Sequence, residues 1–390
     1  MTDLGQDAVD LCRALVRRPS VTPQDAGAQE ALAARLRQAG FSVESVTFSA
    51  PGTPDVVNLF ARFGEGAPHF AFAGHTDVVP PGDLARWRSD PFAAEIDGGE
   101  IIGRGVVDMK GAIAAFAAAA ASFCARGPFK GSISLLITGD EEGPAINGTE
   151  KLLAWAAERG ARFDHCLVGE PTNPDALGDM IKIGRRGSLN GTLTVTGRQG
   201  HVAYPQRADN PIPAAMRLAQ ALAAPPLDAG TALFDPSNLE IVSFDVGNPA
   251  FNVIPAQARA RFNIRFNDHW TPQSLAAELQ TRAARAAQGA DFALAFEPCN
   301  ALAFVTEPDA FVGLVAGAVE RTTGRRPKLS TSGGTSDARF IRAYCPVLEF
   351  GLVGQTMHMV DERAPAAEIG ALAAIYEAVL DDYFRVFAHG

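Results

Sequence analysis

Apolar runs and helical stretches alternate along the first 180 residues of the chain. The run "HFAFAGHTD" (69–77) is apolar, and "GSISLLITGD" (131–140) and "DHCLVGEP" (164–171) repeat that pattern. Helical patterns cover 110–126 and a stretch near 149–159. Strands that alternate with helices predict an α/β fold, with a mostly parallel sheet flanked by helices on both faces. Ligands of such sheets gather at the carboxyl ends of the strands.

The pattern changes near residue 187. "GSLNGTLTVTG" alternates polar and apolar residues, as a half-exposed strand does. The following segments are a helix at 209–223, strands at 239–246 and 256–266, a helix at 272–287 and a strand at 291–297. This β-α-β-β-α-β order is typical of a ferredoxin-like α+β domain. A helix at 308–323 and the apolar "CPVLEFGLV" then resume the first pattern. We therefore predict a discontinuous larger domain, 1–180 and 298–390, into which a second domain, 181–297, is inserted.

Composition and charge narrow the class of protein. The chain has 390 residues, 47% hydrophobic and 20% charged, which fits a soluble globular protein of two domains. The formal net charge of −10 argues against nucleic acid or an anionic membrane as a partner, so an anionic substrate needs a local basic pocket. The five cysteines, at 12, 124, 166, 299 and 345, are dispersed, which favours reduced thiols over a disulfide framework.

Neither a secretory signal nor a membrane span is predicted. The first 20 residues have an amphipathic helical pattern without the apolar core of a signal peptide. The most apolar run, "GAIAAFAAAAASFCARG", is short and better explained as a buried helix. We therefore expect a cytoplasmic protein.

Six polar residues end predicted strands or begin a predicted helix of the larger domain: His75, Asp108, Glu141, Glu142, Glu170 and His358. Two imidazoles and several carboxylates at one sheet edge match the nitrogen and oxygen ligands of zinc. The set is large enough for two ions that share one carboxylate, an arrangement used for metal-assisted hydrolysis. In the Glu141–Glu142 pair, one residue can bind metal while its neighbour takes a proton from water. Asp77 lies on the same strand face as His75 and could accept that histidine's second ring N–H.

Each of these residues also has a simpler explanation. A histidine at a strand end is more often a hydrogen-bonded structural residue, and Asp108 before a helix is an ordinary N-cap candidate. Glu170 could end a strand in solvent. The Glu141–Glu142 pair could be a solvated loop or pair with arginines, although no arginine is close in sequence. His69 lies in no comparable pattern, and we expect it to be structural or at the surface. The joint pattern favours a metal centre.

The segments "GHTDVVP", "GRGVVDMKG", "TGDEEGPAINGT" and "GEP" resemble the successive motifs of the zinc peptidase family that includes aminoacylases, acetylornithine deacetylase and succinyl-diaminopimelate desuccinylase. The resemblance covers almost the whole chain. It implies a zinc-exopeptidase-like catalytic domain with an inserted ferredoxin-like lid and dimerisation domain. Within the family, "GDEEGPAINGT", "IGRRGSLNG" and "SGGTSDARF" are most similar to the desuccinylases. The implied reaction releases succinate and LL-2,6-diaminopimelate from N-succinyl-LL-2,6-diaminopimelate, in lysine and diaminopimelate biosynthesis.

The resemblance also implies a cofactor and the residues that bind it. The cofactor is two Zn²⁺ ions per subunit, for which Co²⁺ can substitute. The implied metal ligands are His75 and Glu170 at one ion, Glu142 and His358 at the other, and Asp108 between them. Glu141 is the implied general acid and base, and the peptide bond Asp108–Met109 is expected to be cis.

The implied substrate carries three carboxylates, which guanidinium groups bind well. Arg185, Arg186 and Arg265 are the candidates by charge, although Arg186 is better explained as a surface residue. The resemblance implies substrate contacts from Arg185, Ser188, Asn252, Arg265 and Thr335. It further implies a homodimer in which His201 of the partner subunit stabilises the oxyanion. Gly354 departs from the pattern, because many desuccinylases have an asparagine there that contacts the substrate.

Other functions stay open from the residues alone. The same chemistry could act on N-acetylornithine, another N-acyl amino acid or a dipeptide, although the arginines favour an anionic acyl group. A non-catalytic metal-binding dimerisation module would be expected to lose Glu141 or a ligand, yet every position is filled. A serine or cysteine hydrolase is disfavoured, because the chain has no nucleophile elbow.

Overall fold

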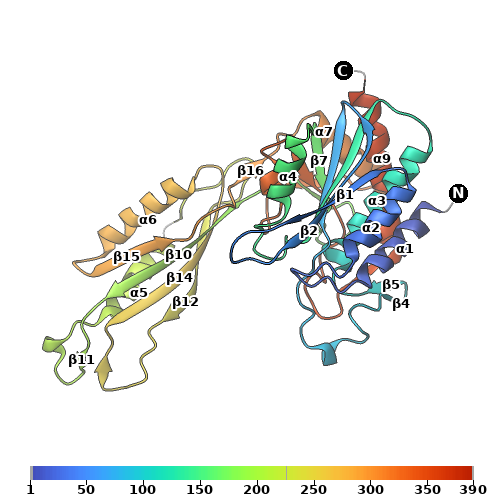
Figure 1. Ribbon diagram of the computed structural model, residues 1–390. Coiled ribbons are helices and arrows are strands. Elements are labelled where there is room, and N and C mark those ends of the chain that lie inside the picture. The colour runs from blue at the N-terminus through green and yellow to red at the C-terminus, as the bar shows by residue number, and fades with distance from the viewer. Residues whose placement is uncertain (1–2, 225, 389–390) are drawn as a thin grey trace. The chain divides into compact units, whose positions relative to one another are not determined.

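The computed structural model describes residues 3–224 and 226–388, which form two compact units (Figure 1). Unit 1 comprises Met1–Ile183, Thr306–Ser330 and Ser336–Gly390, and unit 2 comprises Gly184–Val305 and Thr331–Thr335. The insertion predicted at 181–297 extends to Val305, because β9 (Gly184–Arg185) and β16 (Phe304–Val305) pair antiparallel at its two ends. The five residues 331–335 also belong to unit 2, which the sequence pattern did not indicate.

Unit 1 is built on an eight-stranded sheet in the order β1-β2-β6-β3-β7-β18-β8-β17. Its strands are β1 (Ser42–Phe48), β2 (Val56–Glu65), β3 (His69–His75), β6 (Gly131–Thr138), β7 (His165–Val168), β8 (Met180–Lys182), β17 (Lys328–Ser330) and β18 (Val347–Glu349). The central strands β6, β3, β7 and β18 run parallel, while β1 and β2 add an antiparallel edge. The predicted fold class, a mostly parallel sheet flanked by helices, is confirmed.

Helices cover both faces of this sheet. On one face, Phe72 of β3 stacks on Phe116 of α3 (Gly111–Ala125) at 4.2 Å and meets Tyr376 of α9 (Ala366–Phe387) edge-on at 5.8 Å. On the other face, Phe60 of β2 meets Trp155 of α4 (Thr149–Glu158) at 5.8 Å. The faces differ because Phe72 is paired with Leu135 and Phe60 with the next residue of β6, whose side chain points the opposite way.

The first helix joins the α3–α9 layer. Gly5 of α1 (Leu4–Val16) and Gly370 of α9 let the two backbones approach, since a Cβ added to Gly370 would lie 3.2 Å from the Cα of Gly5. The remaining elements of unit 1 are α2 (Ala28–Gln38), α7 (Ala310–Thr323), α8 (Ala338–Ile341), the short turns η1 (Leu84–Arg86) and η2 (Val106–Lys110), and a small sheet of β4 (Glu95–Asp97), β5 (Glu100–Ile102) and β19 (Arg363–Pro365).

The most apolar helix is part of the core, as predicted. Within the described residues, Val106–Ala125 is the one helical stretch long and apolar enough to cross a membrane, but 89% of its most apolar window is buried inside the protein. The five cysteines are free, and four of them are buried.

Unit 2 contains a four-stranded antiparallel sheet in the order β12-β14-β10-β15. Its main elements are β10 (Gly187–Thr196), α5 (Pro211–Ala223), β12 (Asn238–Asp245), β14 (Gln257–Phe266), α6 (Pro272–Ala286) and β15 (Asp291–Phe296), which confirms the predicted β-α-β-β-α-β order. Burial alternates along β10, where Leu193 packs in one core with Leu218 of α5 and Leu279 of α6. Two short paired strands, β11 (Gly200–His201) and β13 (Val253–Ile254), and the turn η3 (Pro205–Arg207) complete the unit.

Candidate metal centre

The central strands of unit 1 bring the predicted ligands to one edge of the sheet. His75 is the last residue of β3, Glu142 follows the end of β6 and Glu170 follows the end of β7. Because these strands are parallel, the residues after them meet at the same edge. Asp108 comes from η2, just before α3, and His358 from the loop between β18 and β19.

The ligand atoms form two groups that share Asp108. In the first group, Nε2 of His75 lies 3.1 Å from Oδ1 of Asp108 and 3.8 Å from Oε1 of Glu170. In the second group, Nε2 of His358 lies 2.7 Å from Oε1 of Glu142 and 3.2 Å from Oδ2 of Asp108. Within each group, one ligand atom per residue can be chosen so that all lie within 4.8 Å of one another. The two oxygens of Asp108 therefore face different groups.

The backbone around Asp108 has the geometry expected from the resemblance. The peptide bond Asp108–Met109 is cis, which confirms that prediction. Gly105 precedes η2 with a φ of 84°, a left-handed conformation that favours glycine. The side chain of Met109 is buried against Gly74 of β3, where an added Cβ would lie 2.6 Å from the methionine methyl.

The carboxylate of Asp77 lies closer to the backbone of Glu141 and Glu142 than to the ring of His75. Nδ1 of His75 lies 2.9 Å from the backbone carbonyl oxygen of Asp77 and 3.7 Å from its carboxylate. The carboxylate instead accepts hydrogen bonds from the backbone N–H groups of Glu141 at 3.3 Å and Glu142 at 3.1 Å. The ring of His75 was expected to bond to the carboxylate of Asp77 but bonds instead to the backbone carbonyl of that residue. The reason is that the carboxylate turns toward the loop after β6.

Asp140 closes the loop that carries the two glutamates. Its Oδ2 accepts hydrogen bonds from the backbone N–H groups of Ile146 at 2.8 Å and Asn147 at 2.9 Å. The side-chain amide of Asn147 donates in turn to the carbonyl oxygen of Pro54 at 2.7 Å. The polar residues of "GDEEGPAINGT" thus stabilise the loop after β6, which Glu141 and Glu142 begin.

The electrostatics of the centre favour positive charge. Burial, opposed by His75 and reinforced by the carboxylates of Asp337 and Asp108, raises the pKa of Glu141 to about 8. Hydrogen bonds to Asp108 and Glu142 raise the pKa of His358 to about 10. Burial alone would lower the pKa of His75, but the hydrogen bond to Asp108 and the surrounding carboxylates raise it well above its ordinary value. Clustered carboxylates that hold imidazoles in the charged form also suit cations.

Unit 2 contains the predicted substrate residues in two groups, of which the first surrounds the start of β10. Ser188 of β10 is paired in register with Arg265 of β14. Arg185 of β9 is buried, and its Nη1 lies 3.4 Å from the carbonyl oxygen of Ser332, in the segment that also contains Thr335. Burial and the charge of Arg186 lower the pKa of Arg265. Arg186, expected at the surface, is partly buried and donates to the side-chain oxygen of Asn238 at 3.0 Å.

The second group lies beyond the other end of β10. His201 of β11 is exposed and paired in register with Val253, the residue after Asn252. Eight residue steps separate Ser188 from Thr196, the last residue of β10, and at about 3.3 Å per step they span about 26 Å. Unit 2 therefore brings Arg185, Ser188 and Arg265 together but leaves His201 and Asn252 apart from them.

Two charged residues beside the candidate ligands were not predicted from the sequence. Arg104 and Glu362 form a buried ion pair with 2.6 Å between Nη1 and Oε2. A signal was present, since Arg104 interrupts the apolar run "IIGRGVV", and a buried arginine needs a carboxylate partner. The partner could not be named, because it lies 258 residues away.

Gly354 stands where many desuccinylases have an asparagine, but the backbone at this position does not require glycine. The N–H of Gly354 donates to the carbonyl oxygen of Asn173 at 2.9 Å. A Cβ added at Gly354 would lie 3.7 Å from the Cβ of Pro171, an ordinary van der Waals contact. The position therefore has room for the start of a larger side chain.

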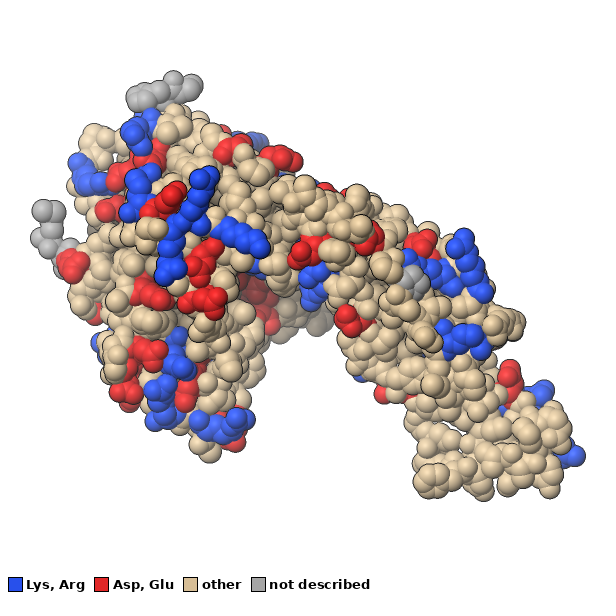
Figure 2. All heavy atoms as spheres, turned by 180° about the vertical axis from the view of Figure 1, so that it is seen from behind, with Lys and Arg blue, Asp and Glu red and all other residues tan. Residues whose placement is uncertain are grey.

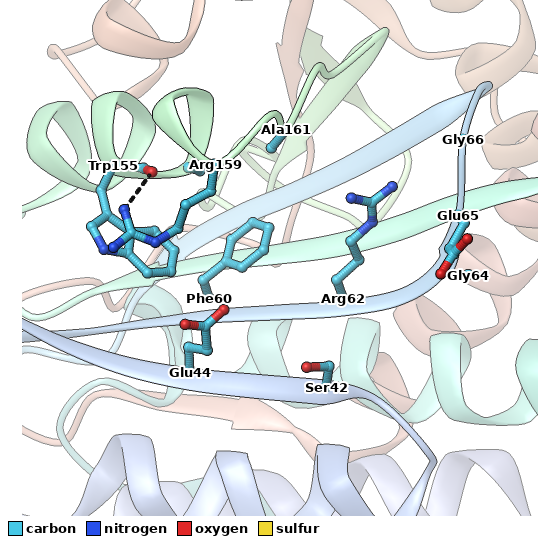
Figure 3. A pocket seen from close by; sticks show the side chains of 11 residues that line it. Ser42, Glu44, Phe60, Arg62, Gly64, Glu65, Gly66, Trp155, Arg159 and Ala161 are labelled. Carbon is cyan, nitrogen blue, oxygen red and sulfur yellow. Dashed lines mark hydrogen bonds between the residues drawn. The ribbon is translucent and has the colours of Figure 1, made fainter.

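A surface groove of about 480 Å³ lies away from this centre, over β1, β2 and α4 (Figure 3). Phe60 and Arg62 point into it from β2, and Arg159 stacks over the ring of Trp155 at 4.0 Å. Arg62 is paired in register with Ser134, in the first half of β6, whereas the glutamates follow the end of that strand. The groove therefore contains none of the predicted site residues.

Comparison with known proteins agrees with the motifs. Residues 71–382 match the sequence pattern of peptidase family M20/M25/M40. The chain is 73% identical over 388 residues to succinyl-diaminopimelate desuccinylase of Methylocella silvestris, covering 99% of this chain and 100% of that protein. It is 64% identical over 382 residues to the protein of the same name from Beijerinckia indica, covering 98% and 100%.

Solved structures share the fold at low sequence identity. The M20 family metallo-carboxypeptidase Sso-CP2 from Sulfolobus solfataricus superimposes with a TM-score of 0.77 at 16% identity, covering 97% of this chain and 100% of that one. The YXEP protein of Bacillus subtilis, described as a dinuclear metal-binding peptidase, superimposes with a TM-score of 0.69 at 16% identity, covering 97% and 98%.

Proposed function

This chain belongs to peptidase family M20/M25/M40, and we propose that it hydrolyses the succinyl amide bond of N-succinyl-LL-2,6-diaminopimelate. The products are succinate and LL-2,6-diaminopimelate, and the reaction is a step of lysine and diaminopimelate biosynthesis. The observation that carries the proposal is the pair of ligand groups sharing Asp108 next to Glu141, in a chain 73% identical to a desuccinylase along its whole length. The free, mostly buried cysteines support a cytoplasmic enzyme.

The donor atoms support a pair of divalent cations at the two groups. Each group offers one imidazole nitrogen and two carboxylate oxygens, the donors that Zn²⁺ and Co²⁺ accept. Asp108 presents one oxygen to each group, as a bridging carboxylate does. We propose Zn²⁺ as the metal, held by His75, Asp108 and Glu170 at one position and by Asp108, Glu142 and His358 at the other. When bound, such ions act as Lewis acids that polarise the amide carbonyl and make a water molecule more acidic.

Glu141 is proposed to move the proton. The charges of His75, Asp108 and Glu142 act on its carboxylate, yet it belongs to neither group and so remains available. Positive charge at the two groups favours the ionised carboxylate, which can accept a proton from the attacking water. The water oxygen forms a bond to the succinyl carbonyl carbon, the carbon–nitrogen bond breaks, and Glu141 returns the proton to the leaving amine. Asp77 holds the backbone N–H groups of Glu141 and Glu142 and so fixes where the proton is taken.

The basic residues at the start of β10 are proposed to bind the carboxylates of the substrate. Arg185 and Arg265 can each hold a carboxylate through a two-pronged hydrogen bond. Burial first and the charge of Arg186 second lower the pKa of Arg265, and a bound anion would offset both effects. Ser188, paired in register with Arg265, and Thr335 are proposed to add neutral hydrogen bonds.

We also propose a homodimer formed through unit 2, with His201 and Asn252 serving the partner's substrate. The separation of about 26 Å along β10 is too long for both groups of one unit 2 to contact one small substrate. The edge strand β12 exposes Val242 to 63% and Phe244 to 41%, and Phe251 before β13 is fully exposed. Figure 2 shows charged side chains scattered over unit 2, with wide areas of uncharged residues between them. An exposed apolar edge strand is suited to pairing with a second copy.

A comparison of two substrates tests the proposed activity. Purified enzyme supplied with Zn²⁺ should release succinate from N-succinyl-LL-2,6-diaminopimelate with a kcat/KM at least 100-fold above that for acetate release from N-acetylornithine. The difference follows from the free carboxylate of the succinyl group, which Arg185 or Arg265 would bind and which an acetyl group lacks. Equal or reversed values would instead assign the chain to an acetyl-amino-acid deacylase of the same family.

A further inference from the structure

Arg104 and Glu362 form a charged pair in the interior of unit 1. The distance between Nη1 and Oε2 is 2.6 Å, and the two side chains are 2% and 0% exposed. Removing both charges from water costs several kcal/mol per ion. A protein with apolar residues of similar size in place of such a pair is often equally stable or more stable. A buried pair of this kind is therefore weak evidence for stability, and its other contacts are more informative.

The glutamate end of the pair holds the backbone at Asp108. Oε1 of Glu362 accepts hydrogen bonds from the N–H of Val107 at 2.9 Å and from the N–H of Asp108 at 3.3 Å. The carbonyl oxygen of Glu362 also accepts from the N–H of Gly103 at 2.9 Å. Because Asp108 belongs to both ligand groups, Glu362 acts on both.

The arginine end holds the backbone at His358. Nη2 of Arg104 donates to the carbonyl oxygen of His358 at 3.3 Å and approaches that of Pro80 at 3.5 Å, while the guanidinium lies over the ring of Trp87 at 5.3 Å. His358 has a φ of 63°, which is uncommon for a residue other than glycine. Such a conformation persists where its surroundings hold it. Arg104 contacts the ligand of the second group only.

We propose that Arg104 and Glu362 are positioning residues that set the separation of the two metal positions. Glu362 fixes the shared aspartate, Arg104 fixes the last histidine, and the ion pair joins the two. The inference rests on the proposed function, since it requires Asp108 and His358 to bind metal. It predicts an asymmetry: a change at Arg104 weakens the second metal position alone, and a change at Glu362 weakens both.

Titration of the metal-free full-length chain with Co²⁺ tests this asymmetry through absorbance and calorimetry, without measuring turnover. The wild type should bind two equivalents. In Arg104→Lys the ammonium can keep Glu362 but lacks the second fork of the guanidinium. It should therefore bind one equivalent as the wild type does and the other about 10–100-fold more weakly. Glu362→Gln should weaken both equivalents.

A double variant separates positioning from stability. Arg104→Met with Glu362→Gln removes both buried charges, so the metal-free chain should unfold at or above the wild-type temperature. Both Co²⁺ equivalents should still bind about 10–100-fold more weakly, because the change at Glu362 acts on both positions. The matched control is Asp7→Asn, which breaks the Arg35–Asp7 pair between α1 and α2 and should leave Co²⁺ binding unchanged.

The outcomes are distinguishable. Wild-type Co²⁺ affinity at both positions in the double variant would overturn the inference and leave the proposed function standing. Equal weakening of both positions by Arg104→Lys would also overturn it. A wild type that binds fewer than two equivalents would refute the proposed metal centre itself, and the inference with it.

Discussion

At the scale of single residues, the adjacent Glu141 and Glu142 differ in the side chains that they contact. Glu142 lies 2.7 Å from His358 in a ligand group, whereas Glu141 belongs to neither group. Asp77 makes this possible, because its carboxylate accepts both backbone N–H groups and so fixes the start of the loop. Two adjacent carboxylates can then have different roles, Glu142 within a ligand group and Glu141 outside both.

The first prediction concerns Glu141. Glu141→Gln keeps the size of the side chain but removes its ability to accept and return a proton, so kcat should fall by about 10²–10⁴-fold. Two metal ions should remain bound, because Glu141 lies outside both ligand groups. Steady-state kinetics and metal analysis of the purified variant measure these two effects. The control is Glu150→Gln, at an exposed position in the first turn of α4, which should leave kcat unchanged. Turnover above a tenth of the wild-type value would assign the proton transfer to another group.

The clustering of the candidate ligands was predictable from sequence, and the contacts that support them were not. His75, Glu142 and Glu170 end or follow parallel strands, so the sheet topology brings these three together, while Asp108 precedes α3 and His358 lies in the loop between β18 and β19. The contact of Glu362 with Asp108 joins residues 254 positions apart, and no local pattern records it. For Asp77, the pattern indicated the correct neighbourhood but not the partner, because strand alternation gives the face and not the rotation of the side chain.

At the scale of secondary structure, long periodic segments were predicted closely and short ones were missed. The helix predicted at 272–287 is Pro272–Ala286, and the strand predicted at 256–266 is Gln257–Phe266. Strands of two or three residues, such as β9 and β16, are too short to show a period. Their pairing is what places the boundary of unit 2 at Val305.

The second prediction concerns β3, which His69 begins and His75 ends. Burial and the nearby charge of Arg62 lower the pKa of His69 from 6.5 to about 4, and the neutral ring is hydrogen-bonded to the carbonyl oxygen of Arg162 at 2.8 Å and to Ser134 at 2.7 Å. The unfolded chain takes up a proton below about pH 6.5, but the folded chain does so only near pH 4. Stability should therefore decrease as the pH falls through this window, by about 2.5 kcal/mol between pH 7.5 and 4.5.

Urea unfolding of the wild type and of His69→Gln at the two pH values measures this contribution. The variant cannot titrate at this position, so its stability should fall by about 2.5 kcal/mol less than that of the wild type. All other titrating groups are shared and cancel in the difference. An identical loss in both proteins would show that His69 keeps its ordinary pKa in the fold.

At the scale of the whole molecule, the third prediction concerns the proposed dimer. His201→Ala and Glu141→Gln should each be inactive alone. When the two proteins are unfolded together and refolded, half of the dimers contain one chain of each kind, and one of their two sites has both residues intact. The mixture should therefore recover about a quarter of the wild-type activity.

In the control mixture, a double variant that has His201→Ala and Glu141→Gln in the same chain takes the place of the single variant His201→Ala. Mixed with Glu141→Gln, it leaves no site with an intact Glu141, so no activity should return. Absence of recovery in the first mixture, with mixed dimers demonstrated by mass spectrometry, would show that His201 acts within its own chain or outside the site.

The close approach of α1 and α9 at Gly5 and Gly370 has a consequence for biosynthesis on the ribosome. Most of unit 2 comes from one continuous stretch, so its sheet can assemble as soon as that stretch leaves the exit tunnel. Unit 1 must wait, since its earliest helix packs against one of the last to be translated. Until then the apolar face of α1 lacks its final cover, and nascent chains stalled before residue 366 should be the form that chaperones bind.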